Sequence, residues 1–356
     1  MIPIEPIPPE KLKPVPISTK NIVFGSVFTD RMFQATYKNG AWQDYKIVPF
    51  GPISLSPAAV VLHYSQEIFE GMKAYRSKDQ VYLFRPEMNA KRLNASAPRM
   101  CMPEFPEADF IEALKTLIKQ EQRWVPNEGK GPALYIRPMM IGTEPSIKVK
   151  SSSEFLFLII LSPVGSYFKS DFTSVKIYVE EKYHRACAGG TGAAKTGGNY
   201  AASLLPTKFV TEKFDCQQIL WLDAKENAII EEVGAMNIFF VEEGKRLVTP
   251  LLSGSILAGV TRDSLLKLGP HLGYEAVERK LRIQEIMDGI KSGYITEIFG
   301  CGTAAVIASV GTFIYKDQQV QVGSGESGPV AKKLFEELTN IQYGLGPDPF
   351  KWRVPV

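Results

Sequence analysis

Lys195 stands in the glycine-rich stretch HRACAGGTGAAKTGGNYAAS, residues 184–203. A lysine among glycines is typical of phosphate-binding loops, because glycines let the backbone approach an anion closely. The nucleotide-binding pattern G-x-x-x-x-G-K-[ST] fits only in part, since Ala194 occupies its second glycine position. Gly197 and Gly198 also follow at once, where that motif needs a helix, and each costs a helix roughly 1 kcal/mol relative to Ala. A nucleotide loop is therefore disfavoured, while a solvent-exposed loop with an incidental lysine stays open.

An acidic pair, Glu231 and Glu232, follows an apolar run in IIEEVGAMNIFF. The segments AGVTR (258–262) and GCGTAA (300–305) combine glycine and threonine at turns, where backbone N–H groups can bind an anion. A lysine, a buried carboxylate and such turns are what pyridoxal phosphate (PLP) requires. The amine binds its aldehyde, the carboxylate keeps the pyridine nitrogen protonated, and the turns hold the phosphate. Because neighbouring strand residues face opposite ways, we expect only one of the two glutamates to reach the ring.

GCGTAA also fits the dinucleotide-binding pattern G-x-G-x-x-G/A, and it follows an expected strand. The match is weak, because no helix of convincing length follows the segment. A dinucleotide-binding enzyme is therefore the runner-up class.

Composition excludes several other functions. The net charge of +3 argues against a nucleic-acid partner, and no apolar run reaches the ~18 residues needed to span a membrane. Four cysteines without C-x-x-C spacing and three scattered histidines predict free thiols and no metal site. The proline-rich start resembles neither a signal peptide nor a transit peptide. We therefore expect a cytoplasmic protein.

The elements that must position these residues indicate a mixed α/β (α+β) protein of two domains, because 356 residues exceed one ordinary core. Helical apolar spacing predicts helices at 88–100, 107–125, 199–214, 258–273 and 329–344, and β-rich runs predict strands at 132–143, 154–164, 175–183, 217–224 and 236–250. Strand, turn and an apolar segment are expected over 294–315. The boundaries predicted are a proline-rich arm at 1–20, a small domain at 21–164, a linker at 165–174 and a large PLP-binding domain at 175–356.

Over about residue 20 to the C-terminus, the chain resembles the branched-chain amino acid aminotransferases, which are PLP enzymes of fold type IV. This resemblance implies a fold like that of D-amino acid aminotransferase, with the cofactor between two domains. The matching stretches, in collinear order, are FGSVFTDRMF, HYSQEIFEGMKAYR, LFRPEMNAKRL, LYIRPMMIGTEPS, LSPVGSYF, RACAGGTGAAKTGGNYAASL, QQILWLDAKENAIIEEVGAMN, SILAGVTR and FGCGTAA.

The resemblance implies a role for each matched residue. Lys195 would be the catalytic Schiff-base lysine that also moves the proton between the substrate and PLP, and Glu232 would bind the pyridine nitrogen. Tyr200 would hydrogen-bond the phenolic oxygen. The phosphate would be held by Arg92, Arg185, Val260, Thr261 and Thr303.

On the substrate side, the resemblance implies an aromatic pocket for branched side chains and a turn that takes the α-carboxylate. It further implies a homodimer in which Tyr64 and the loop from Ile147 to Val149 reach the neighbouring site. Ala305 and Ala308 stand where mammalian members carry a C-x-x-C pair, so that redox switch is absent. The pocket residues would be Phe24, Tyr64, Phe69, Tyr135 and Tyr167, and the turn residues Thr303 and Ala304.

One pocket must then accept both an apolar side chain and the carboxylate of glutamate, which requires a cation. Arg137 is the best candidate, because it lies two residues after Tyr135 and so faces the same way on a strand. Its fork also suits a carboxylate. The alternative is a structural arginine that pairs with an acid such as Glu70.

The function expected is reversible, ping-pong transfer of the amino group of L-leucine, L-isoleucine or L-valine to 2-oxoglutarate. A D-amino acid transaminase or a lyase of the same fold is the alternative enzyme, and a PLP-binding protein without turnover is the alternative outside catalysis.

Overall fold

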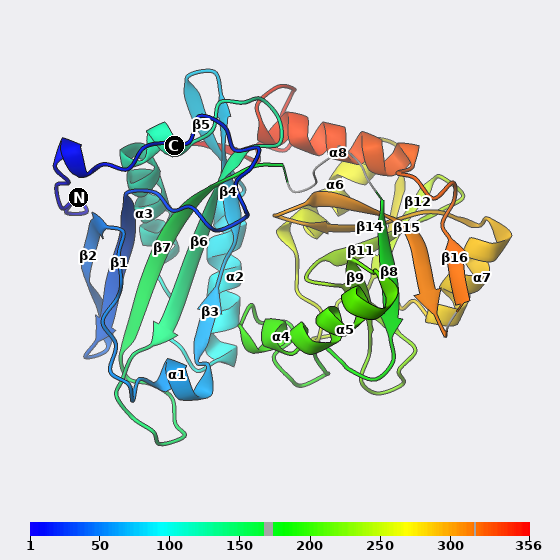
Figure 1. Ribbon diagram of the computed structural model, residues 1–356, viewed down its shortest axis with the longest axis horizontal. Coiled ribbons are helices and arrows are strands. Elements are labelled where there is room, and N and C mark those ends of the chain that lie inside the picture. Colours follow the sequence, from blue (N-terminus) through cyan, green and yellow to red (C-terminus); the bar gives the residue numbers. More distant parts are fainter. Residues whose placement is uncertain (167–173, 317) are drawn as a thin grey trace. The chain divides into compact units, whose positions relative to one another are not determined.

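The computed structural model describes residues 1–166, 174–316 and 318–356. The chain forms two compact units (Figure 1). The first comprises Met1–Tyr167, Ala194–Gly197 and Asn340–Val356, and the second comprises Phe168–Ala193 and Gly198–Thr339. The expected linker lies mostly outside the described residues. The sequence assigns residues 194–197 and 340–356 to the large domain, whereas both segments pack with the first unit.

The first unit is built on one antiparallel sheet, which has eight strands among the described residues. Its order is β17-β5-β4-β6-β7-β1-β2, and β3 pairs with β6 off this path. β6 and β7 pair over their full length, from Ala133–Val164 to Gly142–Phe155. The strands are β1 (Arg31–Lys38), β2 (Ala41–Pro49), β3 (Glu67–Phe69), β4 (Met72–Ser77), β5 (Gln80–Phe84), β6 (Ala133–Gly142), β7 (Phe155–Val164) and β17 (Arg353–Pro355).

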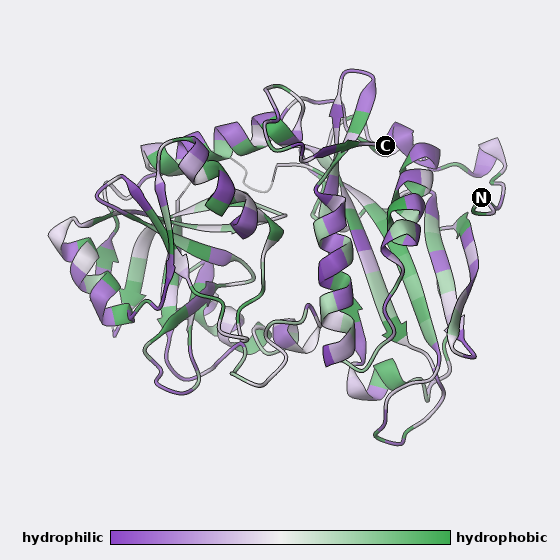
Figure 2. Cartoon of the chain, turned by 180° about the vertical axis from the view of Figure 1, so that it is seen from behind, coloured by the Kyte–Doolittle hydropathy of each residue, from purple (hydrophilic) through white to green (hydrophobic). Residues whose placement is uncertain are grey.

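Helices α2 (Pro86–Arg99) and α3 (Glu107–Gln120) share a core with this sheet. The buried side chains of α3 recur at the spacing of one helix face, so the helix lays a single apolar stripe against the strands. The colouring in Figure 2 shows the same division, with hydrophobic stretches along the strands and hydrophilic ones along the helices. The buried residues of α3 are Phe110, Ala113, Leu114, Leu117 and Ile118.

Short elements complete the first unit. The start of the chain lies along β2 through a parallel bridge between Ile4 and Ile47. Helix α1 (Val60–Tyr64) is followed by its C-cap Ser65, which has a left-handed backbone with φ 51°. The 3-10 helices are η1 (Pro9–Lys11) and η2 (Gln122–Trp124).

The second unit is built on a mixed sheet of nine described strands, in the order β10-β9-β8-β15-β14-β11-β12-β13, with β16 beside β15. β8 runs parallel to both β9 and β15, and β12 runs parallel to β13. The strands are β8 (Val175–Glu180), β9 (Gln218–Leu222), β10 (Ile230–Val233), β11 (Asn237–Glu242), β12 (Arg246–Pro250), β13 (Glu275–Arg279), β14 (Ile295–Gly302), β15 (Val306–Tyr315) and β16 (Gln318–Gln321).

The segment 199–214, in which Pro206 predicts a kink or the end of a first helix, forms two helices, α4 (Gly198–Ala201) and α5 (Leu204–Phe214). The break precedes Pro206, which lies in the first turn of α5, where its missing N–H is not needed. The other helices are α6 (Val260–His271), α7 (Ile283–Ser292) and α8 (Pro329–Gln342), of which α8 begins in the second unit and ends in the first. Among the described residues, no helix combines the length and apolar character that a membrane crossing needs.

Candidate active site

Lys195 is held in the first unit by its backbone. Its N–H donates to Ser96 Oγ at 2.9 Å, and its carbonyl accepts the N–H of Phe69 at 3.0 Å. Ser96 lies on α2 and Phe69 ends β3, so a helix and a strand together fix the lysine. Its Nζ lies 4.7 Å from the centroid of the Phe69 ring. The amine therefore lies against an aromatic face, on a residue that is half-buried.

Glu70 and Arg92 form a buried bidentate pair beside this lysine. Arg92 Nε and Nη2 donate to the two carboxylate oxygens at 2.7 and 2.8 Å, and Asn89 Nδ2 donates at 2.7 Å. Burial raises the pKa of the Glu70 carboxyl, but Arg92, Lys195 and Asn89 outweigh it, so the pKa lies below its usual value. Glu70 is therefore ionised and orients Arg92. Glu70, the acid considered above as a structural partner for Arg137, therefore pairs with Arg92 instead.

Arg137 and Tyr135 lie on one face of β6, as the alternation of strand residues predicts. Arg137 Nη2 donates to Tyr135 Oη at 3.1 Å, and its guanidinium carbon lies 4.6 Å from the Phe69 centroid. Phe24 packs edge-on against Tyr135, with centroids 4.8 Å apart. Among the described residues, Arg137 forms no ion pair with a carboxylate. A Cβ at Gly71 would collide with the Tyr135 hydroxyl, so a larger residue there would displace the Tyr135 side chain.

Glu67 is a second carboxylate on this face and carries no role in the sequence prediction. It begins β3 two residues before Phe69, and its Oε1 accepts the backbone N–H of Gly197. Burial raises the pKa of the Glu67 carboxyl, and the Gly197 N–H, Arg137 and Lys195 offset this rise only in part. Its position inside HYSQEIFEG gave no signal, because contact with residue 197 depends on the tertiary fold.

Arg185 and Glu232 form the central ion pair of the second unit. Arg185 Nε lies 2.9 Å from Glu232 Oε2, and both side chains are buried. Glu232 Oε1 also accepts the Leu257 N–H at 2.8 Å and Asn237 Nδ2 at 3.3 Å. An arginine and two neutral donors favour the ionised carboxylate. The phosphate contact that the resemblance implies for Arg185 stays a prediction.

Glu231 is also buried, and a register shift in β10 between Ile230 and Glu232 breaks the strand alternation at this residue. The expectation that neighbouring residues face opposite ways therefore does not apply here. The two glutamates differ instead in their partners. Burial raises the pKa of the Glu231 carboxyl, despite a hydrogen bond from Ser255 and the charge of Arg185. Glu232 has the better-stabilised negative charge.

Val260 and Thr261 open α6, after Gly259 as its N-cap. The first backbone N–H groups of a helix lack helical partners and favour an anion. A Cβ at Gly259 would collide with the Asn237 side-chain oxygen, so this close approach connects the start of α6 to the residue that also contacts Glu232. Thr303 and Ala304 lie in the turn between β14 and β15. The turn is followed by strand β15, whereas a dinucleotide-binding motif requires a helix at this point.

The remaining expected residues lie at separate places. Tyr200 lies on α4 in the second unit. Tyr64 ends α1 and donates its hydroxyl to the carbonyl of Ile147, so α1 and the loop from Ile147 to Val149 are joined within one chain. Tyr167 lies outside the described residues. No cluster of potential metal ligands occurs among the residues described.

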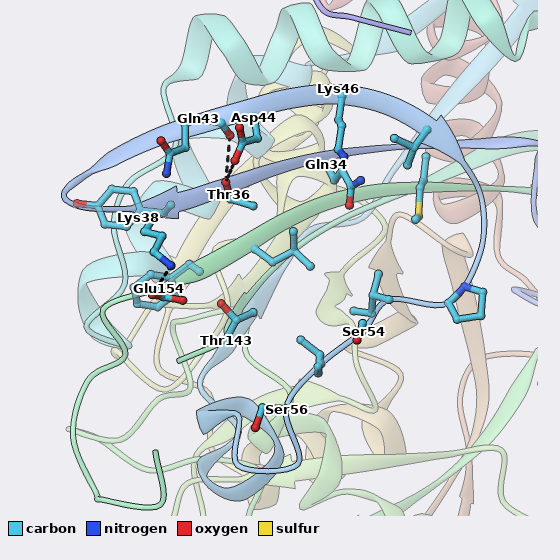
Figure 3. A pocket seen from close by; sticks show the side chains of 18 of the residues that line it. Gln34, Thr36, Lys38, Gln43, Asp44, Lys46, Ser54, Ser56, Thr143 and Glu154 are labelled. Atoms are coloured by element: carbon cyan, nitrogen blue, oxygen red, sulfur yellow. Dashed lines mark hydrogen bonds and ion pairs between the residues drawn. The ribbon is translucent and has the colours of Figure 1, made fainter. Parts of the chain in front are cut away.

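A groove of about 660 Å³ lies on the first unit's sheet, along β1, β2, β7 and residues 52–56 (Figure 3). Its wall is largely polar. Thr36 donates to Asp44 at 2.7 Å, and Lys38 pairs with Glu154 at 3.0 Å. Lys195 does not line this groove, so we assign the groove no part in the chemistry.

The sequence profile of the family amino-transferase class IV matches residues 67–312. A probable branched-chain-amino-acid aminotransferase of Staphylococcus epidermidis is 49% identical over 349 residues, which cover 98% of this chain and 96% of the relative. The Escherichia coli branched-chain amino acid aminotransferase structure covers 91% of this chain and 98% of its own, with a TM-score of 0.73 and 27% identity. The chain belongs to the class IV aminotransferase family.

Structures of the T.th. branched-chain amino acid aminotransferase are also similar, at 25% identity over 90% of this chain and 97% of theirs. One is complexed with N-(5'-phosphopyridoxyl)-L-glutamate, at a TM-score of 0.70, and another with 4-methylvaleric acid, at 0.69. These matches confirm the family expected from the sequence, its mixed α/β fold and the class of enzyme, a PLP-dependent transaminase.

Proposed function

We propose that the protein catalyses the reversible transfer of the amino group of L-leucine, L-isoleucine or L-valine to 2-oxoglutarate. The observation that carries the proposal is the Phe69 ring with two cations against it, Lys195 and Arg137. An amine, a carboxylate-binding fork and apolar aromatic surface are what one site needs to accept both leucine and glutamate. The names of the relatives support the same substrates.

The described residues fit PLP. When bound, PLP supplies an electron sink that makes a proton on the substrate's α carbon labile. Lys195 Nζ would attach the cofactor covalently and carry that proton. Glu232 would face the pyridine nitrogen, because its carboxylate is kept ionised by Arg185 and the Leu257 N–H. The ion pair supports a role for Arg185 in orienting Glu232, beside the phosphate contact that the resemblance implies.

The phosphate would be held at the start of α6 by Val260 and Thr261, with Thr303 and Arg92 as further donors. The buried pair with Glu70 fixes the Arg92 guanidinium in one direction, which suits a bidentate anion contact. Tyr200 would donate to the phenolic oxygen. On the substrate side we assign Phe24, Tyr64, Phe69, Tyr135, Tyr167 and Ala304 the roles that the resemblance implies.

The test of this function is an assay of the purified protein with PLP and 2-oxoglutarate, and with L-leucine and D-leucine in parallel. We expect glutamate and the branched 2-oxo acid to form from L-leucine alone. Turnover of D-leucine would favour the D-amino acid transaminase. PLP binding without any spectral change on adding L-leucine would favour a binding protein without turnover.

Replacing Arg137 by Met should impair glutamate and 2-oxoglutarate far more than leucine, by about 2–3 kcal/mol more, the scale of a charged hydrogen bond. The reason is that only the dicarboxylates need the fork, while Met preserves apolar contact with Phe69. Single-turnover rates with leucine and with glutamate measure the difference. Arg282→Met, at a 59% exposed side chain in the second unit, is the control. Equal losses for both substrates would make Arg137 structural.

We also propose a homodimer in which Tyr64 and the loop from Ile147 to Val149 enter the partner's site. Ile147 and Val149 are 71% and 80% exposed, which is unusual for two neighbouring large apolar side chains. Replacing both by Asp should therefore disrupt the dimer, because an interface charge without a partner costs several kcal/mol. Sedimentation should show monomers for this variant and dimers for Ile17→Asp, a control at a fully exposed arm position. Dimers in both would contradict the assigned interface.

A cytoplasmic location belongs to the same proposal. The thiols of Cys101 and Cys187 are exposed and unlinked, which is typical of a reducing compartment.

A further inference from the structure

Glu67 shares one face of the first unit with both cations of the proposed substrate site. It lies two residues before Phe69 on β3, so the two side chains point the same way. Lys195 and Arg137 both lie against the Phe69 ring, and both interact electrostatically with the Glu67 carboxylate. Two cations therefore lie against one aromatic ring, and a carboxylate from the same strand acts on both of them.

The Glu67 carboxylate is placed by a backbone hydrogen bond. Its Oε1 accepts the Gly197 N–H, two residues after Lys195. Within the described part of the chain, Arg137 forms no ion pair with Glu67, and its fork donates to the Tyr135 hydroxyl. Glu67 thus reduces the positive charge of the pocket while leaving the Arg137 fork available to a ligand.

We propose that Glu67 determines the dual specificity of the site, by balancing Arg137 when an apolar side chain is bound and by taking up a proton when a dicarboxylate binds. This inference rests on the proposed function. Without Glu67, leucine would bury its side chain beside an uncompensated guanidinium, which is costly. With Glu67 ionised, the distal carboxylate of glutamate would face a like charge.

Proton uptake removes that conflict. The distal carboxylate of the ligand stays ionised and pairs with Arg137, while Glu67 becomes a neutral acid with a proton taken from the buffer. The charged groups that act on the Glu67 carboxylate are Arg137 on β6 and Lys195, and the Gly197 N–H donates to it. The burial of Glu67, which already raises its pKa, makes this protonation less costly than it would be at the surface.

The test compares two unreactive acids on the PLP-loaded enzyme, namely glutarate and 4-methylvalerate. Both present one carboxylate where a substrate presents its own, and only glutarate has a second. Their Kd ratio between pH ~6 and ~9 therefore isolates the side-chain pocket from titrations common to both ligands. Raising the pH deprotonates Glu67, so the ratio of the glutarate Kd to the 4-methylvalerate Kd should rise, by up to about tenfold per pH unit.

In Glu67→Gln the ratio should become independent of pH, and in Glu112→Gln, an exposed position on α3, it should rise as in the wild type. A flat ratio in the wild type, or a slope retained in Glu67→Gln, would overturn the inference. Calorimetry of the wild type in buffers of different ionisation enthalpy gives a second readout that needs no variant. Glutarate should take up more protons than 4-methylvalerate, and equal uptake would contradict the proposal.

The two proposals fail differently. If the enzyme transfers amino groups from leucine and the Kd ratio is flat, the role of Glu67 is wrong and the function stands. If neither acid binds and no transfer occurs, the proposed function is wrong.

Discussion

Lys195→Ala should lose all measurable transamination, and borohydride should no longer fix the cofactor to the chain. The methyl group of alanine can neither attach an aldehyde nor carry a proton. The fold should persist, because Lys195 is anchored through its backbone to Ser96 and Phe69 and the substitution leaves those bonds intact. Activity, borohydride labelling and thermal unfolding measured together separate chemistry from stability.

Lys208→Ala is the matched control, since its side chain is 73% exposed on α5 and pairs only loosely with Glu212. That variant should retain wild-type turnover and labelling. Normal turnover by Lys195→Ala would disprove the PLP assignment altogether.

Glu232→Gln should reduce turnover by about 100-fold or more, equivalent to ~2.7 kcal/mol in the activation free energy. An amide can still accept the Leu257 N–H, but it carries no charge to keep a pyridine nitrogen protonated. It also leaves Arg185 without its ion pair, so unfolding must be measured alongside activity.

Glu231→Gln is the matched control for this change, because the residue is adjacent and equally buried. Its loss should be much smaller, since burial raises the pKa of Glu231 and so disfavours its charged form, and a neutral amide can still accept the hydrogen bond of Ser255. Equal losses of turnover in the two variants would show that its ion pair and hydrogen bonds do not give Glu232 a role different from that of Glu231.

The elements with strong local signals could be predicted from the sequence. The apolar spacing at 107–125 gave α3, and the β-branched and aromatic runs at 132–143 and 154–164 gave β6 and β7 within one or two residues. The buried residues of each of these elements recur at a regular spacing within the element itself, so a short stretch of sequence shows the pattern. Pro206 predicts a kink or the end of a first helical segment, and the helix is indeed divided, although the break lies just before the proline, which takes the first turn of α5.

The parts that depend on distant segments could not be predicted. Residues 194–197 lie in the sequence between two segments of the second unit but pack with the first, and local periodicity cannot show this. The contact of Glu67 with Gly197 follows from that crossing, and so it was missed. The register shift beside Glu231 was also invisible, since a bulge depends on the partner strand. The roles given to Arg92 and Glu232 rest on the resemblance to the family. Their ion pairs, with Glu70 and Arg185, are visible only in the folded structure.

The last residues of the chain complete a sheet begun by the first. β17 pairs with β5 through Arg353–Phe84, Val354–Leu83 and Pro355–Tyr82, so this edge stays uncovered until residues 353–355 have been synthesised. A ribosome adding ~5–20 residues per second leaves it open for roughly 13–54 s, the time for the 270 residues between positions 84 and 354. During that interval the open edge can pair with another nascent chain. The protein's yield should therefore depend on translation speed and on chaperones that hold the N-terminal half.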